Sequence, residues 1–209
     1  MKHKPTLLIF LTFFFCTLSL SAEALTFSGG YTKMDMQEGH QIINLSDGAH
    51  VENGSLSIQA KSIQINGENY SFLTCTDTVI ITDTDKGMTL RTNKITYDRT
   101  NDLIESDSFI EMDNTDIAFH VTAHYLNYDV DKGTMELQVD VKLYHDAEGK
   151  LMACQADSLS FDLTNKMLVL LGNATVDYDG NNYQAQAITI DLNTNAIKMD
   201  GNIKGTIDG

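Results

Sequence analysis

The chain has 209 residues and carries 14 Lys and Arg against 29 Asp and Glu, a net charge of −15 at neutral pH. So negative a protein repels nucleic acids and anionic membrane surfaces, and neither is expected as a partner. About 185 residues follow the first 24, which fits one domain. The apolar residues of this part show no helical period, so an all-β protein is expected.

Residues 1–24 are predicted to be a signal peptide. Lys2 and Lys4 form a basic start, residues 6–20 form an apolar stretch, and residues 22–24 match the small-x-small pattern of a cleavage site. Export into the periplasm is therefore expected. The alternative is an uncleaved anchor, because the apolar stretch is close to the shortest that spans a bilayer.

Residues 25–209 are predicted to form one domain of repeated strand hairpins. A possible first strand near residues 27–36 is followed by five tandem copies, each with a leading strand, a turn rich in Gly, Asn or Asp, and a returning strand. Alternating apolar residues mark the leading strands as Leu45–Val51, Leu73–Val79, Ile104–Ile110, Leu137–Leu143 and Leu170–Val176, with a sixth start at Met199.

The returning strands share a small residue that is followed by apolar residues three and five positions later. In the fifth copy these are Ala185, Ile188 and Ile190. The phase of the apolar residues shifts across Gln186-Ala187, so a bulge or corner is expected there. The first positions recur every 29 to 33 residues, as Ala60, Thr92, Ala123, Ala156 and Ala185.

The repeat collects its apolar residues into columns that face one side. Such columns form either the closed core of a sandwich or the lining of a groove between two facing sheets, and the sequence leaves both open. Repeats of constant length give sheets of uniform width, which can hold an acyl chain along their whole length. The inward columns are predicted to contain Val51, Ile63, Ile65, Val79, Ile95, Tyr97, Ile110, Leu126, Tyr128, Leu143, Leu159, Phe161, Val176, Ile188 and Ile190.

Two stretches resemble a known family. Residues 41–51 and 54–65 read QIINLSDGAHV and GSLSIQAKSIQI, and residues 170–176 and 185–191 read LLGNATV and AQAITID. They are similar to the units of the OstA-like family, L-x-G-N-A-x-V, a turn, then A-D-x-I-x-I. The resemblance covers nearly all of the chain after the signal peptide. It departs from the family pattern at Thr92, which replaces a small Ala.

The resemblance implies an open, twisted β jelly roll of about five strand-hairpin repeats of roughly 30 residues. It also implies that the inward columns bind the acyl chains of lipopolysaccharide or a related glycolipid, without a cofactor. Members of the family pass this lipid from the inner to the outer membrane. They associate head to tail and with inner- and outer-membrane components of the same fold. A cleavable signal favours the soluble bridge member over the membrane-anchored one.

Two other functions remain open at this point. The first is a structural or surface β-repeat protein with a closed core, which binds a protein or polysaccharide by its outer face. The second is a carbohydrate-active enzyme with a solenoid fold, which would need a pair of carboxylates. Such enzymes usually have a shorter period and longer loops, and no pair stands out, so no catalytic residue and no enzyme activity are predicted.

No metal site is predicted. His120 and His124 would share one face of a helix, but the pattern here is that of a strand. The segments 83–87 and 129–133 begin like calcium loops and lack the later ligands, so turns with solvated carboxylates are expected.

Two further features concern cysteines and edges. Cys75 and Cys154 fall on inward columns, as two buried thiols or as a disulfide. The segments 27–36 and 197–207 carry few charges that would oppose strand pairing. Head-to-tail self-association through these edges is therefore expected, with growth into filaments.

Overall fold

The structure is a computed structural model that describes residues 24–37, 40–147 and 149–207. The predicted signal peptide, apart from Ala24, lies outside the described residues. Within these ranges no helix is both long enough and apolar enough to cross a membrane. One short 3-10 helix, Glu68–Tyr70, interrupts the strands.

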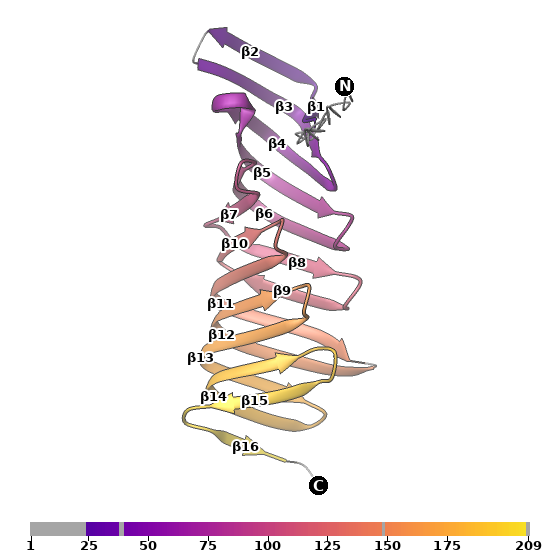
Figure 1. The fold of residues 1–209 in the computed structure, drawn as a ribbon, viewed down its shortest axis with the longest axis vertical. Coiled ribbons are helices and arrows are strands. Elements are labelled where there is room, and N and C mark those ends of the chain that lie inside the picture. Colours follow the sequence, from indigo (N-terminus) through magenta and orange to yellow (C-terminus); the bar gives the residue numbers. More distant parts are fainter. Residues whose placement is uncertain (1–23, 38–39, 148, 208–209) are drawn as a thin grey trace, which may run out of the picture.

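All described strands belong to one antiparallel 16-stranded sheet, whose strands lie across the long axis of the molecule (Figure 1). The first strands lie at one end of this axis and the last strands at the other. The strands are β1 (Thr26–Ser28), β2 (Tyr31–Gln37), β3 (His40–Asn53), β4 (Leu56–Asn66), β5 (Phe72–Asp83), β6 (Met88–Asp98), β7 (Leu103–Ser106), β8 (Ile110–Asn114), β9 (Phe119–Ala123), β10 (Tyr125–Asp129), β11 (Thr134–Ala147), β12 (Lys150–Asp162), β13 (Met167–Tyr178), β14 (Asn181–Asp191), β15 (Ala196–Asp200) and β16 (Lys204–Thr206).

Each long strand bends once at a β-bulge, which divides the sheet into two walls. The pairing of β13 with β14 shows the rule: Leu171 pairs with Ala187 and Ala174 with Ala185, so two residues of β13 lie opposite one residue of β14. The corner predicted at Gln186-Ala187 is thus present, and the extra residue belongs to the leading strand. The same shift occurs in β3, β5 and β11. An extra residue bends its strand and turns the sheet.

The two walls consist of alternate halves of the long strands. Wall one holds the first halves of the leading strands and the second halves of the returning strands, and wall two holds the complementary halves. The bulges form the corner between the walls. The seam is the opposite border, where the hairpin turns of the two walls meet. Wall one consists of residues 42–46, 62–65, 72–76, 94–98, 103–106, 125–129, 134–138, 158–162, 167–171, 187–191 and 196–200, and wall two of residues 49–53, 56–60, 79–83, 88–92, 110–114, 119–123, 141–147, 150–156, 174–178 and 181–185.

The third copy departs from this pattern, because its leading strand is two strands, β7 and β8. The single strand predicted over Ile104–Ile110 is therefore wrong. Side chains replace backbone pairing at this corner: Ser106 Oγ donates to the Lys94 carbonyl at 2.8 Å, and Thr92 Oγ1 donates to the Phe109 carbonyl at 2.8 Å. Strands β6, β7, β10, β11, β9 and β8 then close into a ring. Thr92, the departure from the small residue of the repeat, serves this corner.

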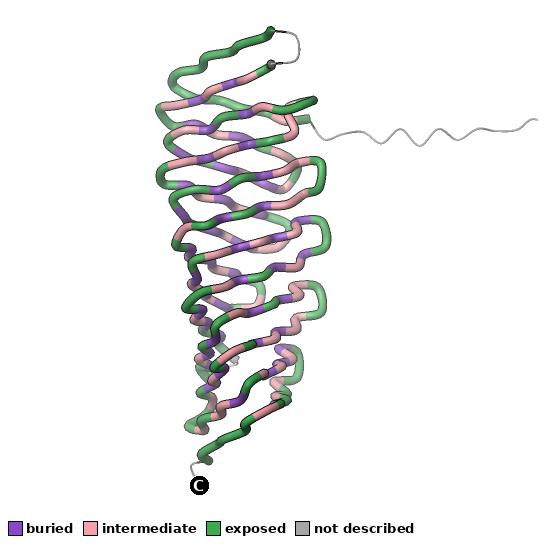
Figure 2. The backbone as a smooth tube through the Cα atoms, turned by 90° about the vertical axis from the view of Figure 1, so that its left-hand side faces the viewer, coloured by how far each residue is buried: buried purple, intermediate pink, exposed green. Residues whose placement is uncertain are grey.

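The core lies between the walls along their whole length. Buried residues alternate with more exposed ones on both walls, as the tube in Figure 2 shows. This alternation follows from the period-two geometry of a strand. The sheet is open at its ends, because β1 and β2 at one end and β15 and β16 at the other have no pairing partner on their outer sides among the described residues.

Two corner glycines provide a test of what the bulge requires. Both have positive φ, +82° at Gly48 and +73° at Gly172, so alanine is strained at either position. A Cβ atom at Gly48 meets nothing within 4 Å, whereas one at Gly172 overlaps the Asp157 side chain. We expect Gly48→Ala to lower the free energy of unfolding by about 1 kcal/mol and Gly172→Ala by about 2 kcal/mol, measured by urea denaturation. Equal losses for the two variants would contradict the expected overlap between the new Cβ atom at position 172 and the Asp157 side chain.

Candidate functional site

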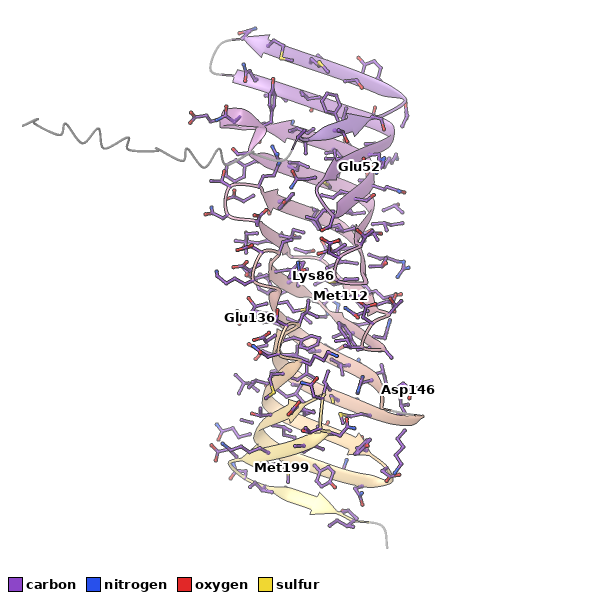
Figure 3. All side chains as sticks on the ribbon, turned by 45° about the vertical axis from the view of Figure 1, so that its right-hand side comes forward. Glu52, Lys86, Met112, Glu136, Asp146 and Met199 are labelled. Carbon is purple, nitrogen blue, oxygen red and sulfur yellow. The ribbon has the colours of Figure 1, made fainter. Side chains whose placement is uncertain are left out.

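The interior between the walls is lined by the predicted inward columns. Every residue predicted for these columns is buried, with at most 1% of its surface exposed. Wall two supplies Val51, Val79, Ile110, Leu143 and Val176, and wall one supplies the remainder. In Figure 3 the buried Met112 lies between the ribbons, whereas the exposed Glu136 and Asp146 lie at the outer sides. The interior is thus a continuous apolar core that runs the length of the sheet.

Each wall ends at the seam in a row of directly paired inward residues. In wall one this row is almost wholly apolar, with two tyrosines. In wall two every leading strand contributes a side chain with a polar atom. The wall-one row is Ile65, Leu73, Tyr97, Ile104, Tyr128, Met135, Phe161, Leu168 and Ile190. The wall-two row is Asn53, Leu56, Asp83, Met88, Asn114, Phe119, His145, Met152 and Tyr178.

The first seam cluster joins the walls near the N-terminal end. Asn53 Nδ2 donates to the Tyr97 hydroxyl at 2.9 Å, and that hydroxyl donates to Asp102 Oδ1 at 2.9 Å. Arg99 Nη2 donates to Asn53 Oδ1 at 3.1 Å. Burial, with the Asp102 carboxylate next to it, raises the pKa of Tyr97, so the hydroxyl stays protonated and donates.

The second seam cluster surrounds Asp83, which is fully buried. Its carboxylate accepts from Ser55 Oγ at 3.0 Å and from the Tyr128 hydroxyl at 3.4 Å. Lys86 Nζ lies 3.5 Å from the same carboxylate and donates to the Val130 carbonyl at 2.7 Å, across the seam. Burial and the nearby Asp83 carboxylate raise the pKa of Tyr128. The solvated carboxylate expected for this turn is therefore wrong for Asp83.

Beyond the second cluster the wall-one row has no hydroxyl. Phe161 packs edge to face on Phe119 across the seam, with ring centroids 5.1 Å apart. Asn114 turns back to its own wall and donates to the Lys86 carbonyl at 2.7 Å. A cavity of 320 Å³ lies at this level and is lined by Asp85, Lys86, Asn114, Asp116, Ile117, Leu163, Thr164 and Lys166. The contact between the two rows is here aromatic, and polar side chains of the turns border the cavity outside it.

The outer face of wall two carries a polar cluster that the sequence did not indicate. His120 Nδ1 lies 2.8 Å from Asp113 Oδ1, and Glu111 is near enough to share a metal ion with them. Arg91 Nη1 already lies 2.6 Å from Asp113 and 3.8 Å from Glu111. His120 and Arg91 together hold the pKa of Asp113 below its usual range. His124, the second histidine of the rejected helical pair, packs on Phe109 instead.

Cys75 and Cys154 are buried free thiols, so the disulfide alternative is not present. Burial raises the pKa of each thiol to about 12. A thiol with so high a pKa is almost entirely protonated at neutral pH and is a poor nucleophile. Both cysteines therefore act as small apolar side chains of the core.

The comparisons with known proteins decide the family. A family model described as lipopolysaccharide-assembly, LptC-related, matches residues 35–146, more than half of the chain. The chain belongs to this LptC-related family. The predicted resemblance to lipopolysaccharide-transport proteins is thereby confirmed. The LptC-related match covers the first three copies and the leading strand of the fourth, so it includes both seam clusters.

No curated protein sequence matches the chain. Among solved structures, it resembles LptH of Pseudomonas aeruginosa, described as the LptA homologous periplasmic component of the conserved lipopolysaccharide transport device. That comparison has a TM-score of 0.29 and 9% sequence identity, and it covers 90% of this chain and 96% of the other. At this TM-score the likeness adds nothing to the LptC-related assignment.

Proposed function

We propose that the chain is a periplasmic carrier that binds lipopolysaccharide or a related glycolipid and passes it from the inner toward the outer membrane. The observation that carries the proposal is the continuous apolar interior between two walls, in a chain of the LptC-related lipopolysaccharide-assembly family. The acyl chains lie between the walls, and the polar head lies outside the seam. The carrier performs no covalent chemistry, and its partners are other transport components at both membranes.

The hydrophobic effect supplies the affinity of such a carrier. Each buried methylene group contributes about 0.8 kcal/mol, so a chain of a dozen carbons held between the walls is bound strongly. In this structure the walls are in contact and the lining residues are buried. Binding therefore requires the walls to separate, with the lipid stabilising the open form that it fits.

Site-specific photo-crosslinking tests the carrier function. A photoreactive residue at Ile95 or Leu159, both buried in wall one, is expected to crosslink lipopolysaccharide when the full chain is incubated with it. The matched controls are the adjacent exposed residues Thr96 and Ser160, whose side chains point to the other face. Crosslinks at the controls alone, or at none of the four positions, would overturn the proposal.

The edge strands support head-to-tail association as the way a bridge is built. Every residue of β2 is exposed, and β16 at the opposite end is exposed as well. An unpaired strand edge offers free backbone donors and acceptors to another chain. Two different edges meeting give a heterologous contact, which grows without closing.

Light scattering behind size exclusion, over a concentration series, tests this association. The mean mass is expected to rise with concentration in steps of one protomer. Gly30 N donates to the Asp47 carbonyl of β3, so the alternate residue Lys33 directs its N–H away from β3. Lys33→Pro therefore removes a backbone donor from the free edge of β2 and is expected to lower the mass at each concentration. A mass of one protomer up to the millimolar range would contradict the association.

A structural β-repeat protein that binds a partner by its outer face is the second candidate function. The observation that favours it is the packed interior, in which the apolar side chains of the two walls already bury one another. The crosslinking experiment separates the two functions, because this candidate traps a protein at an outward position and no lipid inside.

A further inference from the structure

We propose that the seam opens at its C-terminal half, and that His145 and Asn195 there bind a hydroxyl group of the glycolipid, at the junction between its polar head and its acyl chains. This inference rests on the proposed carrier function and adds the position and the chemistry of one contact. It follows from the way polar residues are partnered along the seam.

The wall-two row changes its partners from one end of the seam to the other. Asn53 and Asp83 each meet a tyrosine hydroxyl of wall one. In the next two copies of the repeat, the returning strands β12 and β14 contribute Phe161 and Ile190 to the wall-one row, and neither side chain has a polar atom. The polar clusters that hold the walls together therefore belong to the N-terminal half. Since an apolar contact is exchanged for a lipid contact at little cost, the C-terminal half is the part that separates.

His145 is the member of the wall-two row that is left without a partner. It pairs with Met152 and Phe119 in the row, so its side chain points inward. Only 7% of its surface is exposed, and its Nδ1 atom has no hydrogen-bond partner. Buried polar atoms are nearly always hydrogen-bonded in native proteins. A ring nitrogen without a hydrogen-bond partner at the border of an apolar interior therefore indicates a place where an atom of a ligand binds.

Asn195 supplies the second open atom, on the facing wall. It lies in the turn between β14 and β15, and its Oδ1 is buried without a partner. Within the described ranges, these are the two buried side-chain atoms that lack one. The seam contacts join the end of β3 to the turn after β6, the turn after β5 to that after β10, and the start of β9 to the end of β12. Extended by one copy, the same order predicts that the end of β11, with His145, faces the turn that holds Asn195.

The two atoms without a hydrogen-bond partner determine which chemical group of a ligand can bind them. The amide oxygen of Asn195 only accepts, so the ligand has to donate a hydrogen bond to it. The imidazole Nδ1 donates or accepts according to its tautomer. A hydroxyl group donates and accepts at once and satisfies both, whereas an ionised phosphate oxygen only accepts and would be repelled by Asn195. The site therefore fits a hydroxyl, carried either by a sugar or by the start of an acyl chain.

Binding of matched amphiphiles to the purified full chain tests the proposal. The probes are hexadecanoate, 3-hydroxyhexadecanoate and dodecyl maltoside, each titrated calorimetrically below its micelle concentration. If the hydroxyl belongs to the acyl chain, the hydroxy acid binds about five- to tenfold more tightly than hexadecanoate. His145→Leu is expected to reduce this preference below about twofold and His145→Gln to retain it. If the hydroxyl is a sugar's, His145→Leu weakens dodecyl maltoside alone.

The control is Asn53→Leu, which removes a polar side chain from the same row within the first seam cluster and is expected to leave these preferences unchanged. Thermal unfolding of each variant establishes that it is folded. Equal affinity of His145→Leu and wild-type protein for all three probes overturns the proposal, as does an equal loss for all three. If wild-type protein also fails to crosslink lipopolysaccharide at Ile95 and Leu159, the carrier function itself is overturned. Crosslinking without a hydroxyl preference overturns this contact alone.

Discussion

Lys86→Met is expected to lower the free energy of unfolding by about 3 kcal/mol, because it leaves the Asp83 carboxylate buried without its cation. The loss stays below the upper range for broken buried pairs, since Ser55 and the backbone amide of Asp85 still donate to that carboxylate. The lost bond from Lys86 Nζ to the Val130 carbonyl also removes a contact across the seam. Urea denaturation followed by circular dichroism measures the change.

Lys132→Met is the matched control for this prediction. Lys132 and Asp129 form an ion pair with the same three-residue spacing as Lys86 and Asp83, but 71% of the Lys132 side chain is exposed. Water screens an exposed ion pair, so the loss for Lys132→Met is expected to be much smaller than that for Lys86→Met. Similar losses for the two variants would mean that the second seam cluster does not hold the walls together.

Phe161→Ala is expected to destabilise the protein by about 4 kcal/mol. The side chain is 1% exposed and packs edge to face on Phe119, so its removal forfeits buried apolar area, leaves a cavity and breaks an aromatic contact. The same change widens the interior at the level where the seam has no tyrosine. The midpoint of urea denaturation falls accordingly, and chemical protection of Cys154 in the core is expected to weaken.

Phe109→Ala is the control for the cavity, because Phe109 also forms an edge-to-face pair, with His124, at 5.4 Å. It lies on the outer corner and is 49% exposed. Surface truncation leaves no cavity, and a loss under about 1 kcal/mol is expected. A loss as large as that of Phe161→Ala would show that the corner, and not the interior, limits stability.

The repeat and its inward columns were predictable because both are local properties of the sequence. Alternation sets which face of a strand is buried, and the phase shift at Gln186-Ala187 marked a corner that the structure contains. The split of the third leading strand was not predictable, since it depends on Thr92 and Ser106 meeting at the corner from different copies. The burial of Asp83 likewise depends on Tyr128, which lies 45 residues away.

One signal of the seam was nevertheless present in the sequence. The inward position at the seam end of each leading strand is a residue with a polar atom: Asn53, Asp83, Asn114, His145 and Tyr178. These positions recur at the period of the repeat, although each taken alone reads as turn chemistry. Which of them finds a partner is decided by the facing row, and alternation within one strand carries no information about that row.

The spacing of the seam contacts also shapes how the chain folds. The hydrogen bonds that join the walls link residues 44 to 46 apart, at Asn53 with Tyr97 and Arg99, Asp83 with Tyr128, and Lys86 with Val130. No part of the seam has to wait for the distant C-terminus, so loop closure costs little at each step. A chain that emerges from a membrane pore N-terminus first can therefore complete the first seam cluster once residue 102 has appeared. It can then add one strand hairpin after another. At any moment only a short unpaired strand edge is exposed to aggregation.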